Sequence, residues 1–325
     1  MKVVAMLGGL GSQMFKYAFY LALREETGEE CQIDTTPFRV MKMWNGYELE
    51  RIFGIRTEDI GKKWKNEERY RNNRKTKWTL EGSVFALNDM EKKKKKVLFY
   101  RRGICVRWRG KNGFLRVVST MKLILRSRVV LWFSARNHSG DTYPEGFLER
   151  KESAYFGEFD HRSDFYFRKY RSLVKETFRF PDFVKEQNRE IAGRMMEGNS
   201  VALHVRRGDH MYDNGDLFQS GYFAKAVNFI KNYTKEKQIF YIFSGEMEWC
   251  REHLRELGLD DSDEVVYVDW NCGEESFRDM QLMTYCQHNI LPISSFSWWG
   301  YYLSNAKNKI VCAPKGYWLE VEHHF

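Results

Sequence analysis

Residues 201–210 read VALHVRRGDH, an apolar run that ends on two adjacent arginines, a glycine and an aspartate. A short apolar run bounded by turn residues is typical of a buried strand. Four more such runs follow it: QIFYIFS (238–244), VVYVD (265–269), NILPIS (289–294) and KIVCAP (309–314). Helical spacing of apolar residues appears between them, over 221–233, 246–257, 274–286 and 296–304. Strands that alternate with helices predict an α/β fold built on a parallel, doubly wound sheet.

The beginning of the chain predicts a second unit of the same kind. KVVAML (2–7) is typical of a buried strand, and apolar residues then recur at helical spacing through QMFKYAFYLALREETG (13–28). We expect Ser12 to cap this helix, Gly28 to end it, and CQID (31–34) to form the next strand. Between residues 60 and 150 the pattern is weak. A chain of 325 residues is longer than one that folds around a single compact core, so we expect two domains, 1–160 and 161–325.

The cysteines and the apolar runs indicate the location of the protein and the kinds of site it can hold. The six cysteines are scattered and form no CxxC pair, which indicates reduced thiols in a cytoplasmic protein without a zinc site. No apolar run reaches membrane-spanning length, and we expect no signal peptide.

The net charge of +9 is unevenly spread, since residues 92–140 hold fifteen Lys and Arg and no acidic residue. This basic block is interpreted either as a solvated, partly helical insertion or as a surface for a polyanion. If the block binds anionic lipid headgroups, the protein would be peripheral on the inner face of the membrane. We expect no nucleic acid partner, because no recognised binding module is present.

Polar side chains follow four predicted strands at their carboxyl ends, where ligands of open parallel sheets bind. They are Arg206, Arg207 and Asp209; Ser244 and Glu246; Asp269 and Asn271; and Ser294, Ser295 and Ser297. Arginine suits phosphate because its planar group donates two parallel, charge-assisted hydrogen bonds. Serines at the start of a short helix add hydroxyls and free backbone N–H groups. The sequence therefore predicts a diphosphate ligand at this edge. An alternative interpretation is that the arginines form a structural salt-bridge network with nearby acids, and that His204 is a hydrogen-bonded residue of the core.

The motifs together resemble glycosyltransferase family 11, the inverting α-1,2-fucosyltransferases that use GDP-L-fucose. The matching stretches occur in family order: GGLGSQMFKYAFYLAL (8–23), NGYELERIFGI (45–55), LHVRRGD (203–209), FSGEMEWC (243–250), DMQLMTYCQHNI (279–290) and SSFSWWG (294–300). The resemblance implies a GT-B type fold, in which two Rossmann-like domains with parallel sheets face a cleft. It places the acceptor in 1–160, which carries the basic block, and the donor GDP-fucose in 161–325. It implies no metal and no other cofactor.

The resemblance also implies roles for residues. Arg206 and Asp209 would be catalytic, with Arg206 and Arg207 on the donor diphosphate and Asp209 as the first candidate for the base. Asp213, Asp216 and Glu246 stay open as alternative bases. The donor side would include His204, Ser244, Glu246, Ser294, Ser295 and Ser297. The acceptor side or cleft would include Gly9, Gly11, Ser12 and Gln13. The acceptor would be galactose in a bacterial surface glycan, an oligosaccharide or a glycolipid.

The chain departs from the family pattern at four places. Ser12 replaces an asparagine, Gly245 an acidic residue and Ile293 an asparagine, and YFGEFDHRSDFY (155–166) replaces a glycine-aromatic-glutamine stretch. A diverged or inactive paralogue that binds a nucleotide sugar or a polyanion without transfer is therefore one alternative. A metal-dependent glycosyltransferase using DSD (261–263) is another, although this segment does not follow a predicted strand.

Overall fold

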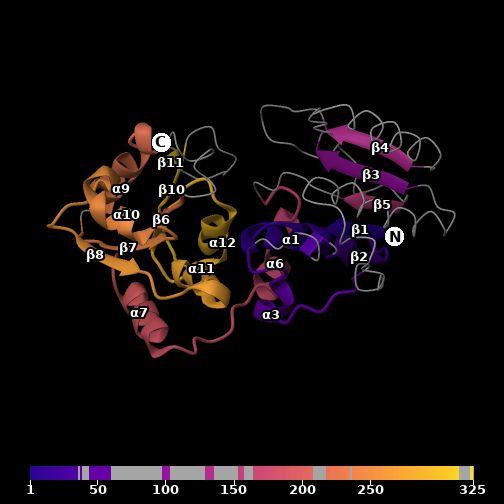
Figure 1. Cartoon of the computed structure of the whole chain (residues 1–325), viewed down its shortest axis with the longest axis horizontal. Coiled ribbons are helices and arrows are strands. Elements are labelled where there is room, and N and C mark those ends of the chain that lie inside the picture. Colours follow the sequence, from indigo (N-terminus) through magenta and orange to yellow (C-terminus); the bar gives the residue numbers. More distant parts are fainter. Residues whose placement is uncertain are drawn as a thin grey trace, which may run out of the picture. The chain divides into compact units, whose positions relative to one another are not determined.

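The computed structural model of the chain describes residues 1–35, 37–38, 44–59, 97–102, 129–134, 153–156, 164–207, 217–234, 236–314 and 323–324. The chain forms two compact units, Met1–Thr177 and Phe178–Phe325, and each is built on its own parallel sheet (Figure 1). The expected α/β class with two parallel sheets is confirmed. The boundary between the units follows Thr177, whereas the sequence placed it after residue 160.

The first unit holds a five-stranded sheet in the order β2-β1-β5-β3-β4. Its strands are β1 (Lys2–Ala5), β2 (Cys31–Asp34), β3 (Val97–Arg102), β4 (Val129–Ser134) and β5 (Ser153–Phe156). Its helices are α1 (Leu10–Thr27), α3 (Leu49–Phe53), η3 (Arg168–Tyr170) and α6 (Arg171–Thr177). The strand, helix, strand unit predicted at the start of the chain is confirmed as β1, α1 and β2. The strands β3 and β4 lie within the basic block 92–140, most of which is outside the described residues.

The ends of α1 show where local sequence reasoning held and where it failed. Gly28 ends the helix as expected: it adopts φ 60°, and its N–H donates to the carbonyl of Arg24. The expected cap by Ser12 is wrong, because the helix begins at Leu10 and Gly9 is its N-cap. Gly8 before it has φ 90°, and a Cβ there would lie 2.7 Å from Cβ of Ser12. Only glycine fits at this position of the turn. The turn ends at Gly9, so the helix starts earlier than expected.

The second unit holds a six-stranded sheet in the order β11-β10-β9-β6-β7-β8, with all pairs parallel. Its strands are β6 (Ser200–Val205), β7 (Ile239–Ser244), β8 (Glu264–Val268), β9 (His288–Ile290), β10 (Val311–Ala313) and β11 (His323–His324). Its helices are α7 (Glu186–Glu197), α9 (Tyr222–Thr234), α10 (Met247–Glu252), η5 (Leu254–Leu257), η6 (Gly273–Glu275), α11 (Phe277–Met283) and α12 (Ser295–Leu303). The five strands predicted for this half are confirmed, with shifts of a few residues at their ends. Of the four predicted helices, 221–233 and 296–304 are confirmed as α9 and α12, whereas 246–257 is divided into α10 and η5, and 274–286 into η6 and α11.

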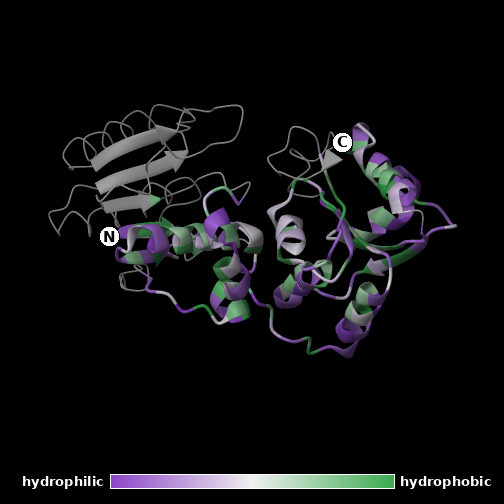
Figure 2. Cartoon of the chain, turned by 180° about the vertical axis from the view of Figure 1, so that it is seen from behind, coloured by the Kyte–Doolittle hydropathy of each residue, from purple (hydrophilic) through white to green (hydrophobic). Residues whose placement is uncertain are grey.

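Two apolar layers bury the faces of the second sheet. Alternate residues of β6 point to opposite faces, so Val201, Leu203 and Val205 pack with α9 and α10. Ala202 packs on the other face with α7 and α11. Figure 1 shows these helix pairs on opposite sides of the sheet, and Figure 2 shows green, hydrophobic strands with purple, hydrophilic residues on the helices around them. The central strands β6 and β7 are therefore buried on both faces and read as nearly continuous apolar runs, whereas four of the five residues of β8 are half-buried.

The strand order places a topological switch at β6. This strand pairs with β7 on one side and with β9 on the other. The chain first moves outward from β6 through β7 to β8, then crosses back to β9 on the opposite side of β6. Ligands of doubly wound folds bind beyond the carboxyl ends of strands at such a switch. The topology therefore identifies the residues that follow β6 and β9 as the candidate ligand site.

No helix within the described ranges combines the length and the apolar character that crossing a membrane requires. Contact of the basic block with lipid stays a prediction.

Candidate active site

The carboxyl edge around β6 gathers most of the donor-side residues predicted from the sequence. Arg206 and Arg207 directly follow β6, and both are half-buried. Ser244 ends the neighbouring β7, where it pairs with Val205 in register. The serine turn at 294–297 follows β9 on the other side of β6. Asp209, Asp213 and Asp216, the candidates for the base, lie outside the described residues, so their placement stays a prediction.

Arg207 is held by contacts within the protein. Its Nε lies 3.2 Å from Oε2 of Glu246, and its guanidinium carbon lies 3.9 Å from the ring centre of Trp249 on α10. Phe218 lies on the same guanidinium at 5.3 Å. Stacked, partly buried arginines of this kind are strongly oriented. Arg207 therefore makes the structural ion pair that the sequence left open, with Glu246 as its partner, and fixes the loops after β6 and β7 to each other.

The serine turn begins α12 one residue earlier than the sequence predicts. Ser294 is the N-cap, and its hydroxyl accepts from the N–H of Phe296 at 3.3 Å. Ser297 is fully buried, and its hydroxyl has no hydrogen-bond partner among the described residues. Ser295 is half-buried in the first turn. Free N–H groups of a first helical turn favour an anion.

His204 lies inside β6 and is buried, with its ring centre 5.9 Å from that of Phe296 on α12. It thereby links the strand that carries the arginines to the helix that carries the serines. The donor-side role of His204 and its alternative as a hydrogen-bonded core residue both stay predictions.

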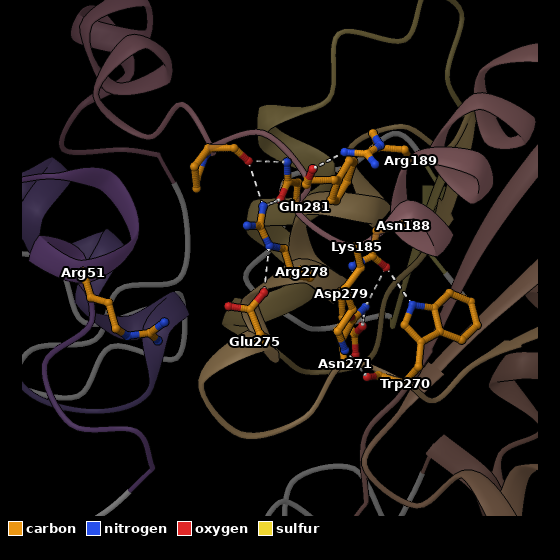
Figure 3. A network of polar contacts seen from close by, with 12 residues as sticks. Arg51, Lys185, Asn188, Arg189, Trp270, Asn271, Glu275, Arg278, Asp279 and Gln281 are labelled. Atoms are coloured by element: carbon orange, nitrogen blue, oxygen red, sulfur yellow. Dashed lines mark hydrogen bonds and ion pairs between the residues drawn. The ribbon is translucent and has the colours of Figure 1, made fainter.

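A buried polar network lies at the neighbouring edge of β8 (Figure 3). The amide Nδ2 of Asn271 donates to Oδ1 of Asp279 on α11 at 2.9 Å. Asn188 on α7 donates to Oδ1 of Asn271 at 2.9 Å, and the indole N–H of Trp270 donates to Oδ1 of Asn188 at 2.6 Å. These bonds tie α7, the loop after β8 and α11 together. Sequence reasoning included Asn271 in this edge but missed Asp279, although an acidic residue opening the apolar stretch DMQLM was a usable signal.

The pKa of Asp279 is raised to about 7, chiefly by burial; the hydrogen bond from Asn271 lowers the pKa, and the nearby carboxylate of Asp269 raises it. The folded protein then holds this proton more tightly than the unfolded chain. Between pH 4 and pH 7 the stability contributed by Asp279 therefore falls as pH rises, by about 1.4 kcal/mol per pH unit.

We expect Asp279→Asn to remove this dependence, because the amide keeps an acceptor for Asn271 and does not titrate. Relative to wild type, the variant should gain roughly 2–3 kcal/mol in free energy of unfolding between pH 5 and pH 7. Urea denaturation of both proteins at the two pH values measures the difference. Burial lowers the pKa of His288 to about 4. Because His288 is present in both proteins, its titration does not change the difference between their free energies of unfolding. A constant difference would show that Asp279 is ionised throughout.

In the first unit, Gln13 is a clamp for the turn between β1 and α1. The side chain is fully buried, and its Nε2 donates to the carbonyls of Gly8 at 2.9 Å and Gly46 at 2.8 Å. Its Oε1 accepts from the N–H of Glu48 at 2.9 Å. Gln13 thus binds the segment 44–48 to the carboxyl end of β1. Gly9, Gly11 and Ser12 lie in the same turn or the first turn of α1, and their acceptor role stays a prediction.

The acidic segment 260–263 lies at the opposite edge of the second sheet, because it precedes β8. Oδ2 of Asp263 accepts from Nζ of Lys231 at 2.6 Å, and Oδ1 of Asp260 accepts from the N–H and the hydroxyl of Ser262. These carboxylates stabilise a turn at the amino end of β8, whereas the arginines lie at the carboxyl end of β6. The placement speaks against DSD as the metal site of a glycosyltransferase.

The chain is similar in sequence to known glycosyltransferases. Residues 62–320 match the family described as Glycosyl transferase family 11. An α-1,2-colitosyltransferase of Escherichia coli is 26% identical over 326 residues, covering 98% of this chain and 93% of that protein. The galactoside α-(1,2)-fucosyltransferase 1 of Plecturocebus brunneus is 27% identical over 151 residues, which cover 43% of this chain and 40% of that protein.

Among solved structures, the fucosyltransferase NodZ from Bradyrhizobium aligns with 92% of this chain and 91% of its own, at 12% identity and a TM-score of 0.47. The family match carries the assignment, since it includes β6, the serine turn and all other described elements of the second sheet up to β10. The chain therefore belongs to glycosyl transferase family 11, and the protein is a glycosyltransferase.

Proposed function

We propose that this glycosyltransferase is an inverting α-1,2-fucosyltransferase that moves L-fucose from GDP-β-L-fucose to a galactose hydroxyl of a glycan. The observation that supports it best is that Arg206 follows β6 and the serine turn follows β9, the neighbouring strand, so that both lie at one edge of the sheet. Arg206 supplies a cation, and the serine turn supplies hydroxyls and helical N–H groups. Two such devices on one edge suit a diphosphate.

The proposed step is a single in-line displacement. The acceptor oxygen forms a bond to the anomeric carbon while the bond from that carbon to the diphosphate oxygen breaks, and the acceptor proton passes to a carboxylate. Negative charge grows on the departing GDP, so a fixed cation stabilises the transition state more than the ground state. Arg206 would supply that charge together with Arg207, which its ion pair with Glu246 and its stacking on Trp249 hold in place at the same edge. Asp209 is our first candidate for the base.

A second donor sugar has support from one relative. The α-1,2-colitosyltransferase aligns with nearly the whole chain, so a colitosyl donor is the alternative to a fucosyl donor. Both hypotheses use the same diphosphate site, and they differ only in the sugar. Parallel assays with the GDP-linked forms of the two sugars, at equal concentration, decide between them by their kcat/KM ratio.

The test of the proposed function is an assay of GDP release with lactose and with a panel of galactosides. We expect release that depends on the acceptor, and a product whose new linkage is α-1,2 by NMR. A β-linked product would contradict inversion. Donor binding without any transfer would favour the diverged paralogue.

The proposal includes a cytoplasmic location, with the basic block 92–140 meeting anionic lipid or glycolipid acceptors at the inner membrane face. Cosedimentation with anionic vesicles but not with neutral ones is expected, and equal behaviour with both would contradict it.

We also expect transfer to need no divalent metal, because fixed arginine charge and helical N–H groups take the place of a cation at the diphosphate. The rate of GDP release should stay within about twofold when EDTA is added in excess. Loss of activity in EDTA that Mn²⁺ or Mg²⁺ restores would contradict this and would reopen the metal-dependent alternative.

A further inference from the structure

Trp44 combines exposure and an unusual backbone conformation. Its side chain is 49% exposed, and its φ is 52°, in the left-handed region. Within the described ranges, Asn308 is the other non-glycine residue with positive φ, and asparagine tolerates that conformation. A bulky residue there is strained, and such strain persists only where the surroundings enforce it.

The surroundings of Trp44 are the clamp made by Gln13. This buried amide holds the carbonyl of Gly46 two residues after Trp44, and it holds the N–H of Glu48. It also holds the carbonyl of Gly8, so both segments are fixed at the carboxyl end of β1. The strained turn is therefore tied directly to the turn before α1.

The indole lies against the backbone of Gly9. A Cβ added to Gly9 would meet Cγ and Cδ1 of Trp44 at 3.7 Å, so the ring occupies the space directly above this glycine. Glycine backbone thus supports the ring, while about half of the side chain is open to solvent. A rigid aromatic surface is thereby displayed at the edge of the first sheet where ligands of parallel sheets bind.

Aromatic rings in ligand sites supply large, flat apolar contact area at little cost in conformational entropy. The face of a galactose ring that carries its C–H groups is the chemical complement of such a surface. We infer that Trp44 is the stacking platform for the acceptor sugar, an inference that rests on the proposed transfer to a galactoside. Gln13 is then a positioning residue, which holds the platform without touching the substrate.

The inference makes Trp44→Asn an informative variant. Asparagine adopts the left-handed conformation with less strain, so the melting temperature should equal or exceed that of wild type. The KM for the acceptor should rise at least tenfold, whereas the Kd for GDP should stay within about twofold. Trp44→Phe should recover most of the acceptor affinity, because it retains an aromatic face. Tyr233→Ala, which removes a 63% exposed aromatic residue from α9 in the second unit, is the control and should leave acceptor KM unchanged.

Each outcome separates the platform from the proposed function. If wild type transfers fucose and Trp44→Asn has an unchanged acceptor KM, the platform is wrong and the transfer stands. A lower melting temperature with unchanged KM would assign Trp44 a structural role instead. If wild type does not transfer, galactoside binding is measured by saturation-transfer NMR in the presence of GDP. Binding that Trp44→Asn abolishes would keep the platform without the transfer, and absence of binding to wild type would overturn both.

Discussion

Arg206→Ala should lower the turnover of GDP-fucose by about 10²–10³-fold, the usual effect of removing one preorganised donor from a developing negative charge. Arg206 directly follows β6 at the topological switch and is half-buried at the sheet edge. Its removal leaves the apolar layers on both faces of the sheet intact. We therefore expect the free energy of unfolding to change by less than about 1 kcal/mol. Initial rates of GDP release and urea denaturation measure the two effects.

Arg207→Ala is the matched comparison on the next residue. This substitution leaves Glu246 without its ionic partner and exposes the ring of Trp249, so it should lower stability as well as turnover. Arg206→Lys should recover only part of the rate, since lysine lacks the planar fork. Unchanged turnover in Arg206→Ala would contradict the phosphate assignment. Loss of folding would instead assign Arg206 to a structural salt-bridge network.

Gly300→Val should lower the free energy of unfolding by about 3 kcal/mol, at the upper end of the cost of overpacking a core. Gly300 lies in the middle of α12, where this helix packs on α11. A Cβ at this position would lie 2.7 Å from Cβ of Met283, and Cβ atoms next to the backbone cannot move away by a change of rotamer. The helix must therefore shift, and it carries Ser295 and Ser297 with it.

The shift of α12 should also weaken donor binding, because the serine turn would move relative to Arg206. Gly193→Val on α7 is the control: it makes the same substitution inside a helix, at a position where nothing lies within 4 Å of the added Cβ. Its stability should stay within about 1 kcal/mol of wild type. Equal stability of the two variants would show that close packing of α11 and α12 is not what holds the serine turn.

The second sheet was predictable from sequence because its central strands are buried on both faces. Residues such as Val201–Leu203 on β6 and Phe240–Phe243 on β7 are apolar without interruption, and loops with turn residues separate the strands from the helices. The carboxyl-edge rule then placed Arg206, Arg207 and the serine turn together without knowledge of side-chain contacts.

Other features depend on contacts that no local pattern contains. The first turn of α1 depends on the space around Gly8, so the prediction for Ser12 was wrong. The helix α7 buries Asn188, Ile191, Ala192 and Met195, but its many charged residues concealed this stripe in the sequence. The bonds between Asn188, Asn271 and Asp279 join residues up to 83 positions apart. The clamp at Gln13 likewise joins two segments that sequence reasoning treated separately.

The central claim is that the carboxyl edge of β6 binds the diphosphate of a guanosine nucleotide sugar. Calorimetric titration of GDP into the full chain, in EDTA, tests it most directly, with Arg206→Ala and Arg194→Ala measured alongside wild type. Arg194 lies on α7 and pairs with Glu264 at the amino end of β8, so it is a surface arginine at the opposite edge. We predict one site, weakened at least tenfold by Arg206→Ala and unaffected by Arg194→Ala. Equal affinity in all three proteins, or no binding to wild type, would contradict the account.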